Sequence, residues 1–313
     1  MTSSSPERRH SVNQPTLPQA LPHALSGERF EFDSIAGKIS CYVDGSGPPL
    51  MLVHTVNAAA SAAEVRPLND YYRQRRTVFS IDLPGYGFSD RSDRAYTPRL
   101  MTDALHALVK QIHQRCGIQP IDALAASLSC EFLARAAMES PAAFARLALV
   151  SPTGFNGKSP RRKAVGETLY LPRLHQFLTG PGWGGSIFRG LTHPRVIHYF
   201  LRRTWGSDHI DEALWAYNVI STRQPGAEYA PLCFLSAAMF SADIHHVYEA
   251  LKLPVWMSHG VRGDFTDYRG KTIVDSKPNW SFTVFQTGAL PYFEVPAAFN
   301  AALDVFLAQP RNP

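Results

Sequence analysis

Short, largely apolar runs recur along the chain, and they predict strands that are buried on both faces of a sheet. These runs are residues 50–54, 77–82, 124–127, 147–151, 254–259 and 281–285. Two earlier segments, 29–33 and 38–43, alternate apolar and polar residues and predict a half-buried antiparallel hairpin at the edge of that sheet.

Segments with helical signals lie between these runs. Residues 58–72 predict a crossover helix, and a second helix runs from Pro98 to Gly117 with Thr97 as its N-cap. Further helices are expected from Ser129 and over residues 295–307. Because strands and helices alternate, we predict an α/β fold with a mostly parallel, doubly wound sheet.

The pattern changes over residues 153–246, which hold many aromatic residues and Gly or Pro interruptions but no buried strand run. We predict an inserted helical lid there, with residues 27–152 and 247–313 forming the core. Residues 1–26 are rich in Ser, Pro, His and Gln, which predicts a disordered N-terminal tail.

Charge and cysteine content argue against nucleic-acid binding and against a metal site. The net charge is +5, but the basic residues come in short scattered groups without interleaved aromatics, so we expect no nucleic-acid partner. The four cysteines lack the spacing of a zinc site or a disulfide scaffold, and we expect no metal or cofactor. With no long apolar segment and no hydrophobic leader, a cytoplasmic location and no membrane partner are expected.

A candidate nucleophile stands where one apolar run meets a helix. In Leu124-Ala-Ala-Ser-Leu-Ser-Cys130, Ser127 is flanked two residues away on each side by a small residue, Ala125 and Ser129. A strand that turns at once into a helix needs small residues at those positions and exposes the residue at its apex. Taken alone, the string favours a structural junction that carries no chemistry, because a motif match needs its structural context.

The order of several such segments resembles the α/β-hydrolase superfamily across residues 29–308. The matching segments are the turn after His54, Asp82-Leu-Pro-Gly-Tyr-Gly, the Ser127 junction, the insertion, Gly260-Val-Arg-Gly-Asp264 and Gly288-Ala-Leu-Pro-Tyr-Phe-Glu294. Agreement in order and position is more specific than any one string. The resemblance implies an α/β-hydrolase fold, a nucleophile elbow and a small-molecule substrate.

The resemblance also implies roles for individual residues. Ser127 would be the nucleophile, and the backbone N–H groups of Leu128 and Val56 would form the oxyanion hole. His54 and Asn57 would line or orient that loop, in which Thr55 replaces the usual glycine. Asp264 would orient the catalytic histidine, with Asp267 as the alternative acid.

The histidine itself is missing from its expected place. Two alignments of the last loop put it at Ala289 or at Tyr292, and neither position holds a histidine. A tyrosine is a poor general base because its ordinary pKa lies near 10. Other histidines remain candidates for a displaced base: His54, His175, His193, His198, His209, His245, His246 and His259.

Three functional hypotheses follow. The first is an esterase-like enzyme that acts on a small, apolar ester or acyl compound through Ser127, with a missing or displaced base. The second is a degenerate member of the fold that binds a ligand or promotes a non-hydrolytic reaction. The third is deliberate removal of the histidine, in which case restoring it at residue 289 or 292 would recover activity.

Overall fold

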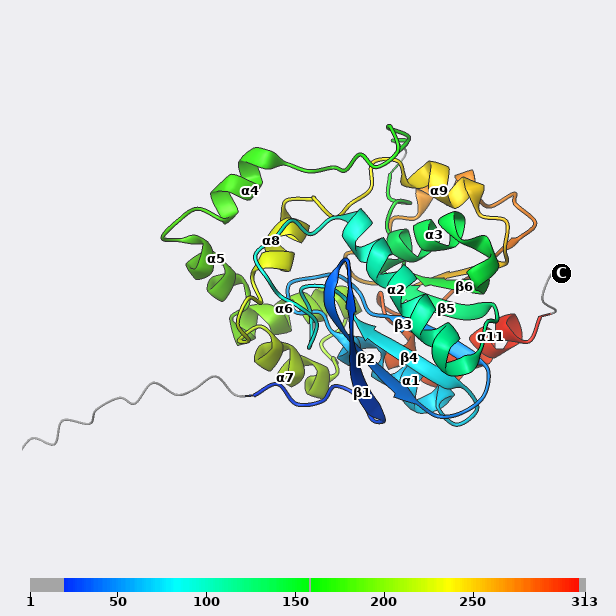
Figure 1. Ribbon diagram of the computed structural model, residues 1–313. Coiled ribbons are helices and arrows are strands. Elements are labelled where there is room, and N and C mark those ends of the chain that lie inside the picture. The colour runs from blue at the N-terminus through cyan, green and yellow to red at the C-terminus, as the bar shows by residue number, and fades with distance from the viewer. Residues whose placement is uncertain (1–19, 158, 310–313) are drawn as a thin grey trace, which may run out of the picture.

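The computed structural model describes residues 20–157 and 159–309, and within them eight strands form one sheet in the order β1-β2-β4-β3-β5-β6-β7-β8. The strands are β1 (Glu28–Ser34), β2 (Gly37–Asp44), β3 (Pro49–Val53), β4 (Thr77–Asp82), β5 (Ile121–Ala126), β6 (Phe144–Val150), β7 (Val255–His259) and β8 (Trp280–Val284). The β1–β2 and β2–β4 pairs are antiparallel and all later pairs are parallel. The mostly parallel sheet and its edge hairpin are therefore confirmed (Figure 1).

Helices cover the sheet and form the insertion between β6 and β7. They are α1 (Arg66–Tyr72), α2 (Pro98–Cys116), α3 (Ser129–Glu139), α4 (Pro172–Leu178), α5 (Gly184–Leu191), α6 (Pro194–Trp205), α7 (Glu212–Ser221), α8 (Tyr229–Leu235), α9 (Ile244–Ala250), α10 (Pro291–Glu294) and α11 (Pro296–Leu307). Short 3-10 helices occupy Ala62–Val65, Pro141–Ala143 and Arg269–Ile273.

Two hydrophobic clusters lie on opposite faces of the sheet. The first contains the buried faces of α2 and α3, including Leu105 and Phe132. The second contains α1 and α11, including Leu68 and Phe299. Alternate residues of the buried strands divide between the two clusters, as in a doubly wound sheet. The chain order reverses at β3, where β4 and β5 lie on either side, and such a switch point opens a crevice at the carboxyl ends of the strands.

Local capping explains why α2 begins where the sequence predicts. The Thr97 hydroxyl accepts a hydrogen bond from the Leu100 N–H at 3.2 Å, Pro98 occupies the first turn, and Gly117 with φ +79° follows the last helical residue. Such a cap satisfies one of the amides that a helix N-terminus leaves without an intrahelical partner.

The predicted crossover helix over 58–72 is too long at its start. Residues 58–61 form a loop, in which the Asn57 side chain accepts the Ala59 N–H at 2.7 Å, and a 3-10 turn over Ala62–Val65 precedes α1. Asn and Ser side chains that bond nearby amides compete with helix formation, which accounts for the delayed start.

The packed chain begins earlier than the predicted boundary at residue 27. Ala24 and Leu25 are buried, and the Ala24 N–H donates to the Tyr42 hydroxyl at 3.1 Å. The Tyr217 hydroxyl donates to the Pro22 carbonyl at 3.0 Å. Residues 20–26 of the predicted tail are therefore held by two tyrosines, while residues 1–19 lie outside the described residues.

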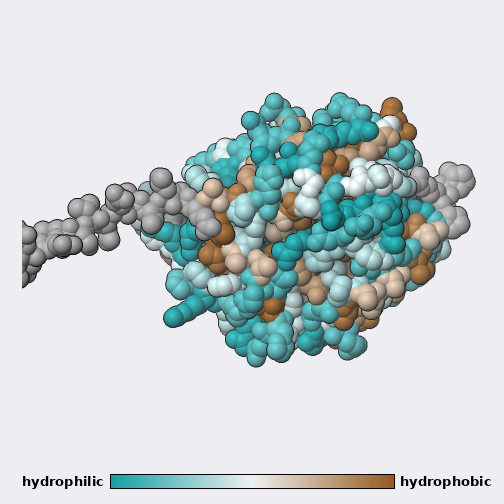
Figure 2. All heavy atoms as spheres, turned by 90° about the horizontal axis from the view of Figure 1, so that it is seen from below, coloured by the Kyte–Doolittle hydropathy of each residue, from teal (hydrophilic) through white to brown (hydrophobic). Residues whose placement is uncertain are grey.

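The insertion places α4 and α5 at the edge of the molecule farthest from α11 (Figure 1). Its strand content in the described residues is a single antiparallel bridge between Thr168 and Ser241. None of the helices in the described ranges combines the length and apolar character that crossing a membrane requires. The face seen from below carries small apolar patches separated by hydrophilic residues (Figure 2).

Candidate active site

Ser127 lies at the apex of a strained turn between β5 and α3. Its φ is +55°, a left-handed conformation that costs a residue with a side chain about 1–3 kcal/mol. The turn is held because the Ser127 N–H donates to the Val150 carbonyl at 2.8 Å and the Cys130 N–H donates to the Ser127 carbonyl at 3.1 Å. The Ser127 hydroxyl makes no hydrogen bond to any described residue and is partly exposed, so it is available to a ligand.

Ser129 links this turn to the loop after β3. Its hydroxyl donates to the His54 carbonyl at 2.5 Å, and Ser129 is fully buried. A glycine at this position would lack that contact. The small residue therefore provides close packing of strand and helix, and it also fixes the turn against the neighbouring loop.

The two backbone N–H groups expected to form the oxyanion hole have no acceptor within residues 20–157 and 159–309. They belong to Leu128, which directly precedes α3, and to Val56, in the loop after β3. The amides at a helix N-terminus favour negative charge, so the Leu128 N–H suits a developing oxyanion.

Glu64 anchors the loop that carries Val56. Its carboxylate accepts the Thr55 N–H at 2.9 Å, the Thr55 hydroxyl at 2.7 Å and the Asn57 side-chain amide at 2.8 Å. Burial raises the pKa of Glu64, and these hydrogen bonds act in the opposite direction. Sequence reasoning missed Glu64, although a single acid within Ala58-Ala-Ala-Ser-Ala-Ala-Glu-Val65 was a signal. The anchor explains how this loop tolerates Thr55 in place of glycine.

His54 uses both ring nitrogens to hold backbone. Its Nδ1–H donates to the Thr55 carbonyl at 2.5 Å, and its Nε2 accepts the Leu83 N–H at 3.0 Å. Burial lowers the pKa of His54 from 6.5 to about 4, so the ring stays neutral. His54 thus has no free nitrogen to accept a proton from Ser127.

Asp264 lies at the surface and pairs with an arginine of α6. Its carboxylate contacts Arg203 at 2.6 Å through Nε and at 2.7 Å through a terminal nitrogen. The alternative acid, Asp267, pairs with Arg269 at 2.7 Å and accepts the Gly157 N–H at 2.9 Å. In the described part of the chain neither carboxylate contacts a histidine.

The two positions expected to hold a histidine are enclosed. Ala289 is buried, its N–H donates to the Thr204 carbonyl at 3.0 Å, and its carbonyl accepts the Ser151 hydroxyl at 2.6 Å. A Cβ on the preceding Gly288 would lie 2.5 Å from the Thr204 carbonyl oxygen. The C-terminal end of α6 therefore packs directly on the loop after β8.

Tyr292 is also enclosed. Its ring packs on Phe293 and Phe299, and its hydroxyl has no partner among the described residues. Burial raises the pKa of Tyr292 well above 10, so it stays protonated.

No histidine within the described ranges hydrogen-bonds to the Ser127 hydroxyl, and several have structural partners. His259 binds the Gly260 carbonyl at 2.9 Å and stacks on Tyr268 with ring centres 4.0 Å apart. His245 lies 2.7 Å from the Gly154 carbonyl. The partners of the others are Ser236 for His175, Arg195 for His193, Glu212 for His198 and Arg162 for His246, while His209 donates its backbone N–H to Ser207.

Comparisons with known proteins identify the fold. A family model described as the alpha/beta hydrolase fold matches residues 48–180, which span β3 to the first helix of the insertion. The chain therefore has the α/β-hydrolase fold. No curated protein sequence matches the chain.

Solved structures of several hydrolases share this fold. An esterase from Exiguobacterium antarcticum has 13% identity and a TM-score of 0.70, over 89% of this chain and 99% of that one. A serine hydrolase involved in carbazole degradation has 14% identity and a TM-score of 0.68, over 90% and 99%. An epoxide hydrolase, CorEH, has 17% identity and a TM-score of 0.69, over 90% and 98%.

A second polar group at the same sheet edge was missed from the sequence. Ser151 follows β6 as Ser127 follows β5, and its φ of +48° is also left-handed. The Ser151 N–H donates to the Ser258 carbonyl at 2.7 Å. Tyr268 is buried, and a hydrogen bond with Ser151 partly offsets the rise of the Tyr268 pKa that burial causes. The signal was a small polar residue directly after a buried strand.

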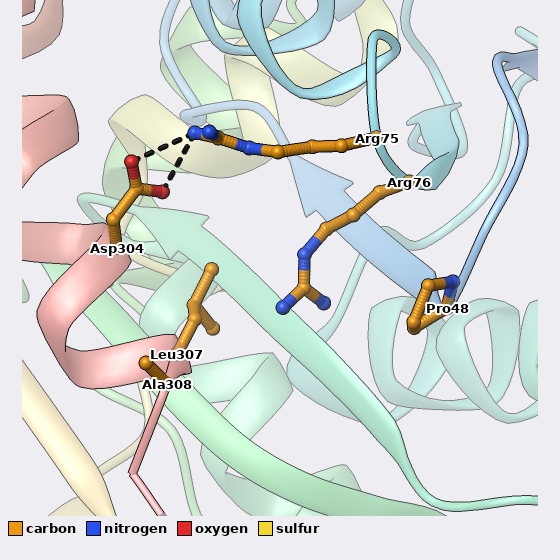
Figure 3. A pocket seen from close by; sticks show the side chains of 6 residues that line it. All are labelled: Pro48, Arg75, Arg76, Asp304, Leu307 and Ala308. Atoms are coloured by element: carbon orange, nitrogen blue, oxygen red, sulfur yellow. Dashed lines mark hydrogen bonds and ion pairs between the residues drawn. The ribbon is translucent and has the colours of Figure 1, made fainter.

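Two surface hollows lie away from Ser127. One, of about 310 Å³, is lined by Pro48, Arg75, Arg76, Asp304, Leu307 and Ala308 (Figure 3). Arg75 pairs with Asp304 and Arg76 with Asp122, and Pro48 directly precedes β3, so this hollow lies at the opposite edge of the sheet. The other, of about 380 Å³, lies between the loop before α5 and α8. Across the described residues no group of three His, Cys, Asp or Glu side chains is placed to hold a metal ion.

His54 and Asp82 have opposite effects on how stability depends on pH. Asp82 is fully buried and accepts the Ala62 N–H at 2.8 Å and the Phe88 N–H at 3.1 Å, and burial raises its pKa from 3.8 to about 6. Its contribution to stability is therefore present below about pH 4 and lost as the pH rises through about 6. The lowered pKa of His54 acts oppositely, because stability is lost as the pH falls from 6.5 towards 4.

Asp82→Asn should make visible the loss of stability at low pH that the lowered His54 pKa causes. We expect the free energy of unfolding of this variant to rise more steeply between pH 4 and pH 6 than that of the unsubstituted protein, by up to about 3 kcal/mol over the interval. Urea unfolding at several pH values measures this, with the exposed Asp275→Asn as the control. A variant curve parallel to that of the unsubstituted protein would contradict it.

Proposed function

We propose that the protein is an esterase-like enzyme that acts on a small, apolar ester or acyl compound, with Ser127 as its nucleophile. The observation that carries the proposal is the left-handed Ser127, whose hydroxyl has no partner in the described residues. The unpartnered N–H groups of Leu128 and Val56 support an oxyanion hole. Attack would form a bond between Ser127 Oγ and the acyl carbon, break the bond between that carbon and the leaving alcohol or amine, and release the serine proton. Water would then hydrolyse the acyl-enzyme ester and regenerate the Ser127 hydroxyl.

The destination of that proton distinguishes this proposal from a Ser-His-Asp mechanism. In a serine protease, loss of the histidine lowers turnover by about a millionfold. The oxyanion hole and substrate binding still accelerate the reaction by about 10³–10⁴-fold over the rate in water. With no imidazole bonded to Ser127, we propose that water or the leaving group takes the proton. Slow turnover and a preference for esters with good leaving groups would follow.

The parts around this site have proposed roles of their own. We propose that residues 153–246 act as a lid over a core formed by residues 27–152 and 247–313. The aromatic content of the insertion supports an apolar substrate, although such residues also pack against one another. A cytoplasmic location and a reaction without a metal or cofactor complete the proposal.

One observation favours the second hypothesis, a member of the superfamily that binds a ligand or promotes a non-hydrolytic reaction. The C-terminal end of α6 contacts both the expected acid and an expected histidine position. Arg203 pairs with Asp264, and the Thr204 carbonyl accepts the Ala289 N–H. In that case Ser127→Ala would retain ligand binding or product formation. For a Ser127 enzyme the same variant would lose product formation from p-nitrophenyl esters.

Restoring the histidine separates these hypotheses from deliberate removal. We expect Ala289→His alone to leave p-nitrophenyl ester hydrolysis within about threefold, because Asp264 stays paired with Arg203. Combining it with Arg203→Ala should free Asp264 and raise the rate by about 10²-fold. Arg203 is exposed, so its loss should change the free energy of unfolding by less than about 1 kcal/mol.

Ala289→Gln, alone and with Arg203→Ala, is the matched control because it fills similar space without a base. Full recovery with Ala289→His or Tyr292→His alone would support removal of a native histidine. If Ala289→His combined with Arg203→Ala shows no increase in hydrolysis rate, Asp264 is not the acid that orients the histidine.

A further inference from the structure

The positive charge of the protein is concentrated in one part of the insertion. Residues 168–207 contain five arginines, Arg173, Arg189, Arg195, Arg202 and Arg203, and no Asp or Glu. The whole chain has 31 basic and 26 acidic residues, so the rest holds 26 of each. The net charge of +5 therefore belongs to the segment that forms α4, α5 and α6.

The same helices expose large apolar side chains. Phe177 of α4 is 60% exposed and Phe200 of α6 is 51% exposed, although a buried position is usual for phenylalanine. Phe177 lies beside the exposed Trp183, and Phe200 beside the exposed Tyr199, with ring centres 6.5 Å and 5.4 Å apart. Exposed aromatic pairs at α4 and α6 of the same insertion are typical of an interaction surface.

Several of these arginines are not neutralised by carboxylates. The side chains of Arg173 and Arg195 have no hydrogen-bond or ion-pair partner in the described part of the chain, and Arg189 donates only to the Ser186 hydroxyl at 3.2 Å. Arg202 and Arg203 pair with Asp208 and Asp264, both of which lie outside residues 168–207. The exposed aromatics are thus accompanied by cations that remain free to bind an anionic surface.

We propose that the outer surface of α4–α6 binds an anionic lipid bilayer peripherally, with Phe177, Trp183, Tyr199 and Phe200 entering the interface. Amphipathic helices that carry basic residues on one face and Trp, Phe or Leu on the other bind in the plane of a bilayer interface, and each basic residue near an anionic leaflet adds attraction. Tyr and Trp side chains suit this interface because one end is apolar and the other polar.

The position of these helices in the molecule suits contact with a bilayer. The α4 and α5 helices lie at the outer edge of the molecule, away from the sheet (Figure 1). A flat bilayer reaches such an edge without contacting the core. This inference departs from the sequence-based expectation of no membrane partner, which rested on the absence of a spanning segment and of a hydrophobic leader. It is independent of the chemistry proposed at Ser127, because its readout is binding.

Co-sedimentation of the full chain with vesicles tests the proposal. Vesicles of phosphatidylcholine with phosphatidylglycerol should bind the protein, and vesicles of phosphatidylcholine alone should bind much less. Added salt should weaken the binding, because screening reduces attraction to exposed arginines. Phe177→Ser combined with Phe200→Ser should weaken it by about tenfold or more.

The control variants replace exposed apolar residues elsewhere on the surface. Ile118 and Val305 are 91% and 70% exposed and lie outside the insertion, so the pair Ile118→Ser and Val305→Ser should bind as the unsubstituted protein does. Substitution of four such exposed residues also keeps the core intact, so misfolding does not confuse the comparison.

Charge reversal supplies a second, independent variant. Arg173→Glu with Arg195→Glu should reduce binding by roughly fivefold or more for each arginine. The exposed Lys110→Glu with Lys252→Glu carries the same charge change outside α4–α6 and should reduce binding less.

Three results would overturn the proposal. The first is no binding to anionic vesicles, which would leave the surface to a protein partner. The second is equal binding to both kinds of vesicle. The third is loss of binding that is as large in the control variants as in the α4–α6 variants.

Discussion

Ser127→Ala is expected to abolish covalent capture of the protein by a fluorophosphonate. The unsubstituted protein should gain the mass of one phosphonyl group slowly, over hours, because the Ser127 hydroxyl is accessible but lacks a base. The variant has no hydroxyl at the turn and should gain none. Intact-protein mass spectrometry follows the reaction, and peptide mapping locates the label.

Ser151→Ala is the matched control for that experiment. Ser151 has the same left-handed backbone at the end of the neighbouring strand, but its hydroxyl is already bonded to the Ala289 carbonyl. This variant should be labelled at Ser127. Labelling of Ser127→Ala at an equal rate would exclude Ser127 as the nucleophile.

Glu64→Ala is expected to lower both stability and the rate of capture. It removes the acceptor of three hydrogen bonds in the loop after β3, from the Thr55 N–H, the Thr55 hydroxyl and the Asn57 side-chain amide. Donors left unpaired cost about 1–3 kcal/mol each, and we expect a total loss of about 3–5 kcal/mol in the free energy of unfolding. Because the Val56 N–H loses its position, capture should slow by about 10²-fold.

Glu64→Gln separates the two effects. Its side-chain oxygen still accepts one or two of the hydrogen bonds, so the variant should remain folded and show an intermediate rate. Urea unfolding and phosphonate capture at low temperature measure both quantities. Capture at the unsubstituted rate in both variants would mean that the Val56 loop contributes nothing to the oxyanion hole.

Most of the fold could be predicted because its signals are local. The apolar runs at 50–54 and 77–82 correspond to β3 and β4, and the cap at Thr97 marks the start of α2. The left-handed turn at Ser127 also follows from the small residues around it, because only such residues allow a strand and a helix to meet so closely.

The remaining features depend on pairing between distant segments. Arg203 and Asp264 are 61 positions apart, and nothing in either local sequence indicates that they form an ion pair. The anchoring of residues 22 and 24 by Tyr217 and Tyr42 is equally remote in sequence. Sequence patterns define elements, whereas the partners of a polar side chain are decided by how those elements pack.

We propose that Ser127 reacts beside an oxyanion hole without a histidine base. The pH dependence of phosphonate capture at Ser127 tests it most directly. We predict that the logarithm of the capture rate rises steadily with pH between about 5 and 9, with no inflection near the ordinary histidine pKa of about 6.5. A rate that instead rises to a plateau with its midpoint near pH 6–7, and loses that midpoint when one histidine is replaced, would contradict the claim.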